Sequence, residues 1–221
     1  NYSRSTTGNI TGNFVGNYAR ATGADSSAVG GAIYNSERGT IGNITGDFIN
    51  NYIQGTGAAA EGGAIMNHAR STIGNITGDF INNYAQGTNA LGGAVYNVNY
   101  ATIGSITGNF IGNYITGSSD NAWGGAIGNT FGATTGNITG DFINNYAQAA
   151  GASAAVYGGA IFNYDGTIGN ITGNFVGNYA LATGAESSAY GGAILNVDAK
   201  TGNITGDFIN NYAQATDASS Y

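Results

Sequence analysis

The sequence GNITGDFINNY at residues 42–52 decides the fold, because the phrase G-N-I-T-G-[DN]-F-x-x-N-Y occurs seven times with few changes. Its copies begin 34, 32, 30, 32, 33 and 33 residues apart, at Gly8, Gly42, Gly74, Gly104, Gly136, Gly169 and Gly202. A second phrase, G-G-A-[IV]-x-N, falls once between each pair of copies, at Gly30, Gly62, Gly92, Gly124, Gly158 and Gly191. A fixed period of about 20 to 50 residues is typical of a solenoid, in which each unit buries its apolar face by stacking on its neighbours.

Three segments of each repeat have the character of short strands: G-G-A-I-x-N, T-I-G-N-I-T and [DN]-F-[IV]-x-N-Y. They carry β-branched or aromatic residues and are flanked by Gly or Asn, while no helical spacing of apolar residues is sustained. The sequence therefore predicts an all-β fold, a parallel β-helix or solenoid of about seven coils of 30–34 residues with three short strands per coil. We expect it to be right-handed, because crossovers between parallel strands almost always are.

The repeat runs through the whole chain without a shift in composition, which predicts a single repetitive domain over residues 1–221. The chain begins and ends inside the repeat. We therefore expect it to be a fragment of a longer array, or to stack end to end on other copies, because uncapped coils present unpaired strand edges.

Positions that never vary among the copies predict the interior. The residue two places before the Asn of G-G-A-[IV]-x-N is always aliphatic and should point inward, whereas the residue between them varies freely and should point outward. That Asn should then turn inward at a corner, where stacked amides satisfy one another along the axis. The expected structural ladders are Asn35, Asn67, Asn97, Asn129, Asn163 and Asn196, and Phe14, Phe48, Phe80, Phe110, Phe142, Phe175 and Phe208, with a further Asn series from Asn17 to Asn211 and a Tyr series from Tyr18 to Tyr212.

Composition argues against several classes of function. The net charge is −7, only five residues are basic, and no basic stripe is apparent, so we predict no nucleic-acid partner and no attraction to an anionic membrane. The sequence contains no run of 18 apolar residues, so we predict no membrane span in this segment. The absence of cysteine excludes disulfides and thiolate metal sites, and no motif calls for a cofactor or a metal.

The outward residues that flank each inward Ile of G-N-I-T-G form the candidate binding surface. Thr follows the Ile in every copy, and Asn precedes it in six copies, with Ser105 in the other. Two such polar columns could order water on ice or lie against a glycan, whereas their structural interpretation is a hydrogen-bonded ladder on a strand face. N-I-T is also a glycosylation sequon, which we interpret as accidental because glycans on adjacent coils would crowd. The candidate columns are Thr11, Thr45, Thr77, Thr107, Thr139, Thr172 and Thr205, with Asn43 and Asn75.

Catalysis has little support in the sequence, so we predict that the chain is not an enzyme and name no catalytic residue. His68 is the only histidine, and no Cys accompanies it. An acidic series could hold Ca²⁺ only where stacked carboxylates converge, which favours a structural turn: Asp47, Asp79, Asp141 and Asp207. Trp123, the sole tryptophan, is either a sugar-stacking platform or a packing residue. A polysaccharide lyase would need a local cluster of acidic and basic groups that interrupts the repeat.

The combination of G-G-A-I with F-x-x-N resembles the passenger repeats of autotransporter-type surface proteins, in particular the polymorphic outer-membrane proteins. G-G-A-[IV] occurs six times and F-x-x-N seven times, so the resemblance covers nearly the whole chain. It implies an extracellular β-helix at a bacterial cell surface, acting in adhesion or as surface structure. Together with the repeat, it predicts a non-enzymatic surface fibre, filament subunit or adhesin stalk that self-associates end to end. The alternative is a module that binds a host or environmental glycan surface, or ice, through the Asn and Thr columns.

Overall fold

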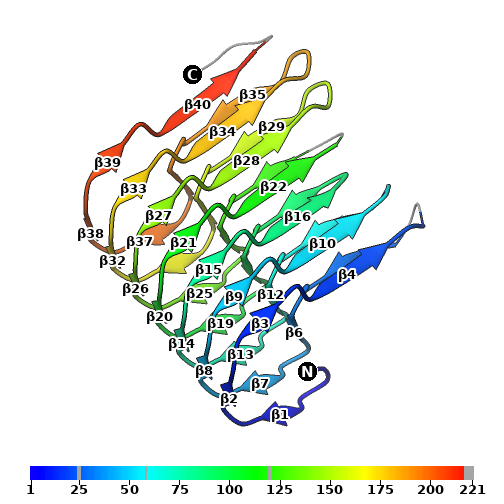
Figure 1. Ribbon diagram of the computed structural model, residues 1–221, viewed down its shortest axis with the longest axis vertical. Coiled ribbons are helices and arrows are strands. Elements are labelled where there is room, and N and C mark those ends of the chain that lie inside the picture. Colours follow the sequence, from blue (N-terminus) through cyan, green and yellow to red (C-terminus); the bar gives the residue numbers. More distant parts are fainter. Residues whose placement is uncertain (24–25, 58, 119–120, 217–221) are drawn as a thin grey trace.

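The computed structural model describes residues 1–23, 26–57, 59–118 and 121–216, and every regular element in these ranges is a β-strand. The chain winds into a parallel β-solenoid with β1 and β40 at opposite ends of its long axis (Figure 1). Copies of the phrase pair in register, so that Phe80 lies between Phe48 and Phe110. The predicted all-β parallel solenoid is confirmed. The described residues include no helix long and apolar enough to cross a membrane.

The described strands form six parallel sheets, which we name A to F in chain order; sheets A to D have seven strands each, and sheets E and F have six. Sheet A contains β1 (Thr6–Thr7), β7 (Thr40–Ile41), β13 (Thr72–Ile73), β19 (Thr102–Ile103), β25 (Thr134–Thr135), β31 (Thr167–Ile168) and β37 (Lys200–Thr201). Sheet B contains β2 (Ile10–Thr11), β8 (Ile44–Thr45), β14 (Ile76–Thr77), β20 (Ile106–Thr107), β26 (Ile138–Thr139), β32 (Ile171–Thr172) and β38 (Ile204–Thr205). Sheet C contains β3 (Phe14–Val15), β9 (Phe48–Ile49), β15 (Phe80–Ile81), β21 (Phe110–Ile111), β27 (Phe142–Ile143), β33 (Phe175–Val176) and β39 (Phe208–Ile209).

The remaining sheets come from the second half of each coil. Sheet D contains β4 (Tyr18–Ala21), β10 (Tyr52–Gly55), β16 (Tyr84–Gly87), β22 (Tyr114–Gly117), β28 (Tyr146–Ala149), β34 (Tyr179–Ala182) and β40 (Tyr212–Ala215). Sheet E contains β5 (Ala28–Val29), β11 (Ala60–Glu61), β17 (Ala90–Leu91), β23 (Ala122–Trp123), β29 (Ala155–Tyr157) and β35 (Ser188–Tyr190). Sheet F contains β6 (Ile33–Asn35), β12 (Ile65–His68), β18 (Val95–Val98), β24 (Ile127–Thr130), β30 (Ile161–Tyr164) and β36 (Ile194–Val197).

The structure divides each coil more finely than the three predicted segments. T-I-G-N-I-T bends at its glycine and becomes two strands; the amide of Gly74 bonds to the carbonyl oxygens of Ile41 and Gly42 at 3.0 and 3.2 Å. The segment [DN]-F-x-x-N-Y is split by a residue in the left-handed conformation, such as Asn50 with a φ of 54° or Asn82 with a φ of 52°. The strands of sheet E, and the strands of sheet D beyond their first residue, Tyr, lie outside the three predicted segments.

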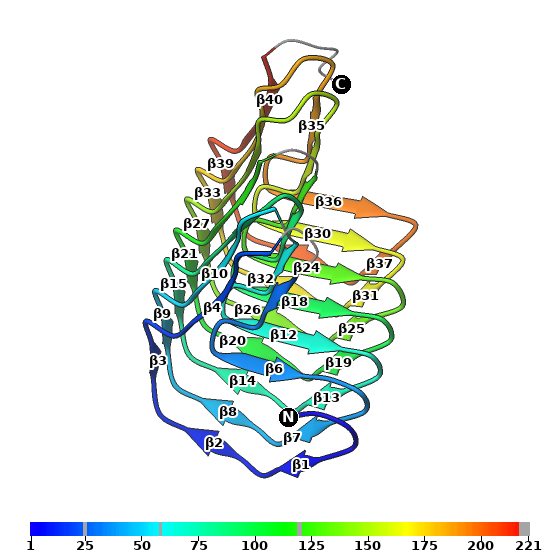
Figure 2. The ribbon, with the colours of Figure 1, turned by 90° about the vertical axis from the view of Figure 1, so that its right-hand side faces the viewer.

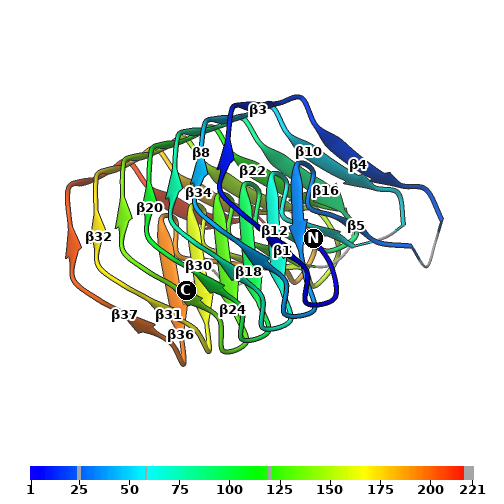
Figure 3. The same ribbon diagram turned by 90° about the horizontal axis from the view of Figure 1, so that it is seen from below.

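The core has two parts. Sheets A, B, C and F enclose the larger cluster, which is built from Ile, Phe and the Ala of G-G-A, for example Ile44, Phe48 and Ala64. Sheets D and E pack face to face on a second cluster of small residues such as Ala60 and Ala90, and together extend away from the other four sheets (Figure 1). Figure 2 shows the strands of sheet F stacked along the axis. Seen from below, the coils repeat the same outline (Figure 3).

The double glycine of G-G-A marks the corner where sheet E turns into sheet F. Gly92 has a φ of +62°, which glycine adopts without a Cβ penalty. A Cβ on Gly93 would collide with the carbonyl oxygen of Gly125 and lie 2.7 Å from that of Tyr114. Only glycine allows the coils to stack this closely at the corner.

Candidate functional site

The predicted Thr column lies on the outer face of sheet B, and all seven of its members are exposed: Thr11, Thr45, Thr77, Thr107, Thr139, Thr172 and Thr205. Thr45, Thr77 and Thr107 pair in register along the sheet. Adjacent strands of a sheet lie about 4.8 Å apart, so the hydroxyl groups form a regular row along the axis. The row is a uniform polar face with no local feature that distinguishes one coil from the next.

The Asn column beside it is also exposed, but its carboxamide oxygens are already used. The amide N–H of Asn43 donates to Oδ1 of Asn9, that of Asn75 to Oδ1 of Asn43, and that of Ser105 to Oδ1 of Asn75, each at 2.9 Å. These bonds link each coil to the next. The Asn column therefore acts in coil stacking, while only its NH₂ groups remain for a ligand.

The acidic series lies in the turn between sheets B and C, at the same position of each coil. Oδ1 of Asp47 accepts the amide of Asp79 at 2.9 Å, and Oδ1 of Asp79 accepts that of Asn109 at 2.7 Å. Asn109 and Asp141 continue the pattern. The carboxylates thus replace Asn in a structural ladder; no group of three His, Asp or Glu side chains suited to a metal ion occurs in the described ranges.

The Asn ladder of sheet F lies inside the solenoid. In this series Nδ2 of each Asn donates to Oδ1 of the Asn in the next coil, for example Asn67 to Asn97 at 2.9 Å and Asn97 to Asn129 at 3.0 Å. Asn35, Asn67, Asn97, Asn129 and Asn163 are fully buried, whereas Asn196 in the last coil is exposed. The buried amides satisfy one another along the axis, as stacked amides can.

A second Asn ladder follows the Phe column. Nδ2 of Asn83 donates to Oδ1 of Asn113 at 2.9 Å and to the carbonyl oxygen of Phe48 at 2.8 Å. The backbone amide of Asn83 donates to the same Oδ1 at 3.0 Å. Each buried Asn therefore joins its own coil to the coils on both sides.

Two aromatic columns run parallel to these ladders. The rings of Phe48, Phe80, Phe110, Phe142 and Phe175 are fully buried, and neighbouring rings from Phe14 to Phe208 stack with centroids 4.6 to 4.8 Å apart. The partly exposed Tyr column from Tyr18 to Tyr212 has spacings of 4.8 to 5.2 Å. Stacked rings of this kind add to the stabilisation that burial provides.

The Tyr column predicts a loss of stability in alkali. Burial, and then repulsion from Tyr114 and Tyr179, raises the pKa of Tyr146 from 10.0 to about 12, and the same causes raise the pKa of Tyr84, Tyr114 and Tyr179. The folded chain keeps protons that unfolded tyrosine releases, so the free energy of unfolding should be constant below about pH 10 and fall between about pH 10 and 12. Thermal unfolding followed by circular dichroism from pH 8 to 12 tests this, and a constant midpoint would contradict it.

His68 connects three consecutive coils through its two ring nitrogens. Its Nδ1 lies 3.1 Å from Oγ of Ser36, and its Nε2 lies 2.9 Å from Nδ2 of Asn99. Because an amide NH₂ only donates, Nε2 accepts and Nδ1 carries the proton that is donated to Ser36. Partial burial lowers the pKa of His68, against the smaller effect of Glu37.

A groove lies between the outer faces of sheets E and F. The residues that vary after the inward aliphatic were predicted to point outward, and they do face away from the core, yet Met66, Tyr96 and Phe162 are buried because they pack in this groove. Toward the C-terminal coils the groove opens into an apolar cavity of about 490 Å³, lined by Trp123, Phe131, Tyr157, Phe162, Tyr164, Tyr190, Leu195 and Val197. Trp123 packs on Tyr157 and Phe162, and its buried Nε1 has no hydrogen-bond partner among the residues that the structure describes.

Comparison with known proteins gives no family. No protein-family model, curated protein or solved structure matches this chain. The function must therefore be inferred from the stacked residue columns of the solenoid.

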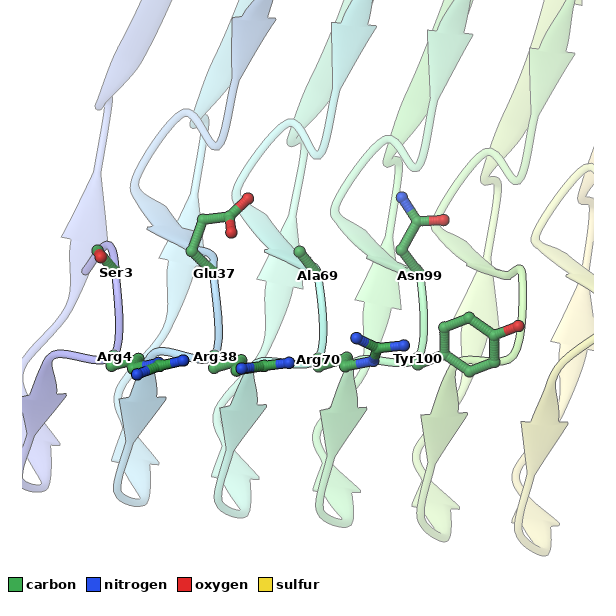
Figure 4. Close-up of a pocket in the computed structure, with 8 residues that line it drawn as sticks. All are labelled: Ser3, Arg4, Glu37, Arg38, Ala69, Arg70, Asn99 and Tyr100. Carbon is green, nitrogen blue, oxygen red and sulfur yellow. The ribbon is translucent and has the colours of Figure 1, made fainter.

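The expectation that no basic stripe exists is wrong. Arg4, Arg38 and Arg70 occupy the same position in three consecutive coils, in the turn from sheet F to sheet A, and Tyr100 occupies it in the fourth. Figure 4 shows these four side chains in one row along the axis. The signal was present in the sequence, since the arginines are 34 and 32 residues apart, as are the copies of G-N-I-T-G that follow them. It was missed because the arginines lie outside both repeated phrases.

Proposed function

We propose that this chain is a non-enzymatic structural protein, a rigid β-solenoid that serves as a subunit of an extracellular fibre or as the stalk of an adhesin at a bacterial cell surface. One observation carries the proposal: the ladders of Phe and Asn run without interruption through consecutive coils. An interior that repeats in this way specifies length and stiffness. The resemblance of the G-G-A-I and F-x-x-N motifs to the passenger repeats of surface proteins supports a location outside the cell.

Core residues are partly exposed in the last coil that the structure describes. Phe208, Ile209 and Tyr212 in the last coil are 53%, 45% and 46% exposed, although their counterparts one coil earlier are buried or half-buried. An end cavity of about 390 Å³ lies between Ala193, Ile194 and the Phe208 ring. A further coil of the same kind, from the same chain or from a second copy, would cover these groups by continuing the ladders. Such head-to-tail contacts do not close and generate filaments.

Electron microscopy of the chain at micromolar concentration tests the proposal. We expect unbranched filaments that lengthen with concentration, and we expect Phe208→Glu to reduce them to single rods, because a buried unpaired carboxylate at each junction is costly. Single rods from the unmodified chain at every concentration would refute end-to-end assembly but not the rod. Compact particles without an axis would refute both.

The exposed Thr row favours a second candidate, a face that binds ice or a glycan. All seven Thr side chains are exposed, and the row is regular along the axis. In this case the sheet B face would carry the activity and the stack would serve only to present it.

The double variant Thr77→Lys with Thr107→Lys separates the two candidates. Both side chains are exposed, so the rod should stay folded, with a loss of about 1 kcal/mol or less from like charges on adjacent strands. Gln54→Lys with Gln86→Lys places a matched pair on sheet D, where these residues also pair in register. Loss of ice-recrystallisation inhibition or glycan binding in the Thr variant alone would favour the binding face. Unchanged rods with no such activity in any chain would support the structural role.

A further inference from the structure

We propose that the arginine column formed by Arg4, Arg38 and Arg70, with the ring of Tyr100 at its end, binds a linear acidic polysaccharide laid along the solenoid axis. The four residues line an open cavity of about 610 Å³ together with Ser3, Glu37, Ala69 and Asn99. This site is separate from the Thr row on sheet B and does not depend on whether the chain forms filaments.

The backbone holds the arginines at the spacing of the coils. The amide of Arg4 donates to the carbonyl oxygen of Glu37 at 2.9 Å, that of Arg38 to Ala69 at 3.0 Å, and that of Arg70 to Asn99 at 2.9 Å. The turns are therefore stacked by the same ladder as the strands, about 4.8 Å apart. The row of positive charges is fixed in place before any ligand arrives.

The arginines stand where the backbone would favour glycine. Arg4, Arg38 and Arg70 have φ values of 58°, 62° and 59°, in the left-handed region, and the equivalent residue of the fifth coil is Gly132 with a φ of 74°. A non-glycine residue is strained in this region, and such strain concentrates at functional positions. Stacking of the turns does not require arginine, because Gly132 stacks in the same column.

The charge of the column is unusual for this chain. Three of the five basic residues lie in it although the net charge is −7. All three arginines are exposed, and only one carboxylate, Glu37, lines the same cavity. Like charges one coil apart repel one another, so anions placed between them would be bound favourably. Guanidinium groups recognise carboxylate and sulfate in a bidentate manner.

The shape of the site favours a single linear chain. The column is one side chain wide (Figure 4), whereas an anionic membrane or a DNA duplex would also meet the acidic remainder of the surface. At its end the ring of Tyr100 is 64% exposed, with Cζ of Arg70 5.6 Å from its centroid, and Asn99 lies beside it. An aromatic face with an adjacent amide suits a sugar ring. In the last two coils the same turn is one residue shorter and carries an exposed carboxylate, Asp165 or Asp198, which disfavours an anion there.

Isothermal titration calorimetry at low ionic strength tests the proposal, with polygalacturonate and heparin as acidic probes and dextran as the neutral one. We expect the full chain to bind an acidic polymer and not dextran. Arg38→Gln with Arg70→Gln should weaken binding at least about 10-fold, because the loss of even one hydrogen bond to a charged group changes the dissociation constant by about that factor. Arg38 and Arg70 are both exposed, so the double variant should fold, and circular dichroism checks this.

A matched control removes the same charge elsewhere. Arg20→Gln with Lys200→Gln changes two exposed basic residues outside the column and should leave the affinity within about twofold. An equal loss in both double variants would mean general electrostatic attraction and would overturn the proposal. So would the absence of binding to both acidic polymers, or tighter binding to oligo(dT) or to phosphatidylserine vesicles than to either polysaccharide.

Discussion

Replacing Phe110 with alanine is expected to lower the free energy of unfolding by about 3–5 kcal/mol, the usual cost of a buried Phe→Ala change. Phe110 is fully buried, and its ring stacks between those of Phe80 and Phe142 with both centroid distances at 4.7 Å. The change leaves a cavity in the middle of the ladder and removes two stacking contacts. Urea unfolding followed by circular dichroism measures the loss.

Phe208→Ala is the control at the end of the same ladder. Phe208 is 53% exposed and stacks on one described neighbour, Phe175. Its removal should cost about 1 kcal/mol, since little buried volume is emptied. Equal losses for Phe110→Ala and Phe208→Ala would contradict a core built from a continuous aromatic stack.

Asn113→Ala is expected to have an effect of similar size, about 3–5 kcal/mol, for a different reason. Its Nδ2 donates to the carbonyl oxygen of Phe80 and to Oδ1 of Asn145, while its Oδ1 accepts both the amide and Nδ2 of Asn83. Alanine leaves several of these buried groups without a partner, and each orphaned group costs about 1–3 kcal/mol. Chemical unfolding and amide hydrogen exchange in the adjacent coils measure the effect.

Asn75→Ala provides the matched control on the outer face. Asn75 is exposed, and its Oδ1 accepts a single bond from the amide of Ser105. Water can replace that bond, so the loss should be about 1 kcal/mol or less. If the outer and inner Asn changes cost the same, the inner ladder does not hold the coils together in the way described.

The repeat, the core and the inner ladders could be predicted from the sequence, because each is formed by residues that recur at one position of the repeat. The Phe and Ile columns, and the Asn that turns inward, can be recognised in the sequence alone. Sheet E, and sheet D beyond its Tyr, were missed because their inward residues are mostly alanines, such as Ala60 in sheet E and Ala85 in sheet D, which have no strand character on their own. They form strands because the two sheets face each other and bury these residues between them.

The exposure of the outward side chains was harder to predict. The alternation of side chains along a strand tells which residues face away from the core, but not whether another part of the chain covers them. Tyr96 faces away from the core and is nevertheless 2% exposed, since the concave angle between sheets E and F covers it. The arginine column was hidden for another reason. Its members are ordinary surface residues in separate turns, and only the stacking of those turns brings them into one row.

Small-angle X-ray scattering tests the central claim, that the chain is a rod of equivalent coils. The measurement compares the chain with a variant lacking residues 104–168, two whole repeats, both carrying Phe208→Glu to prevent stacking of copies. The account predicts the same cross-sectional radius of gyration and a rod shorter by about 10 Å, two strand spacings. A changed cross-section, or loss of the folded state in the shortened chain, would contradict it.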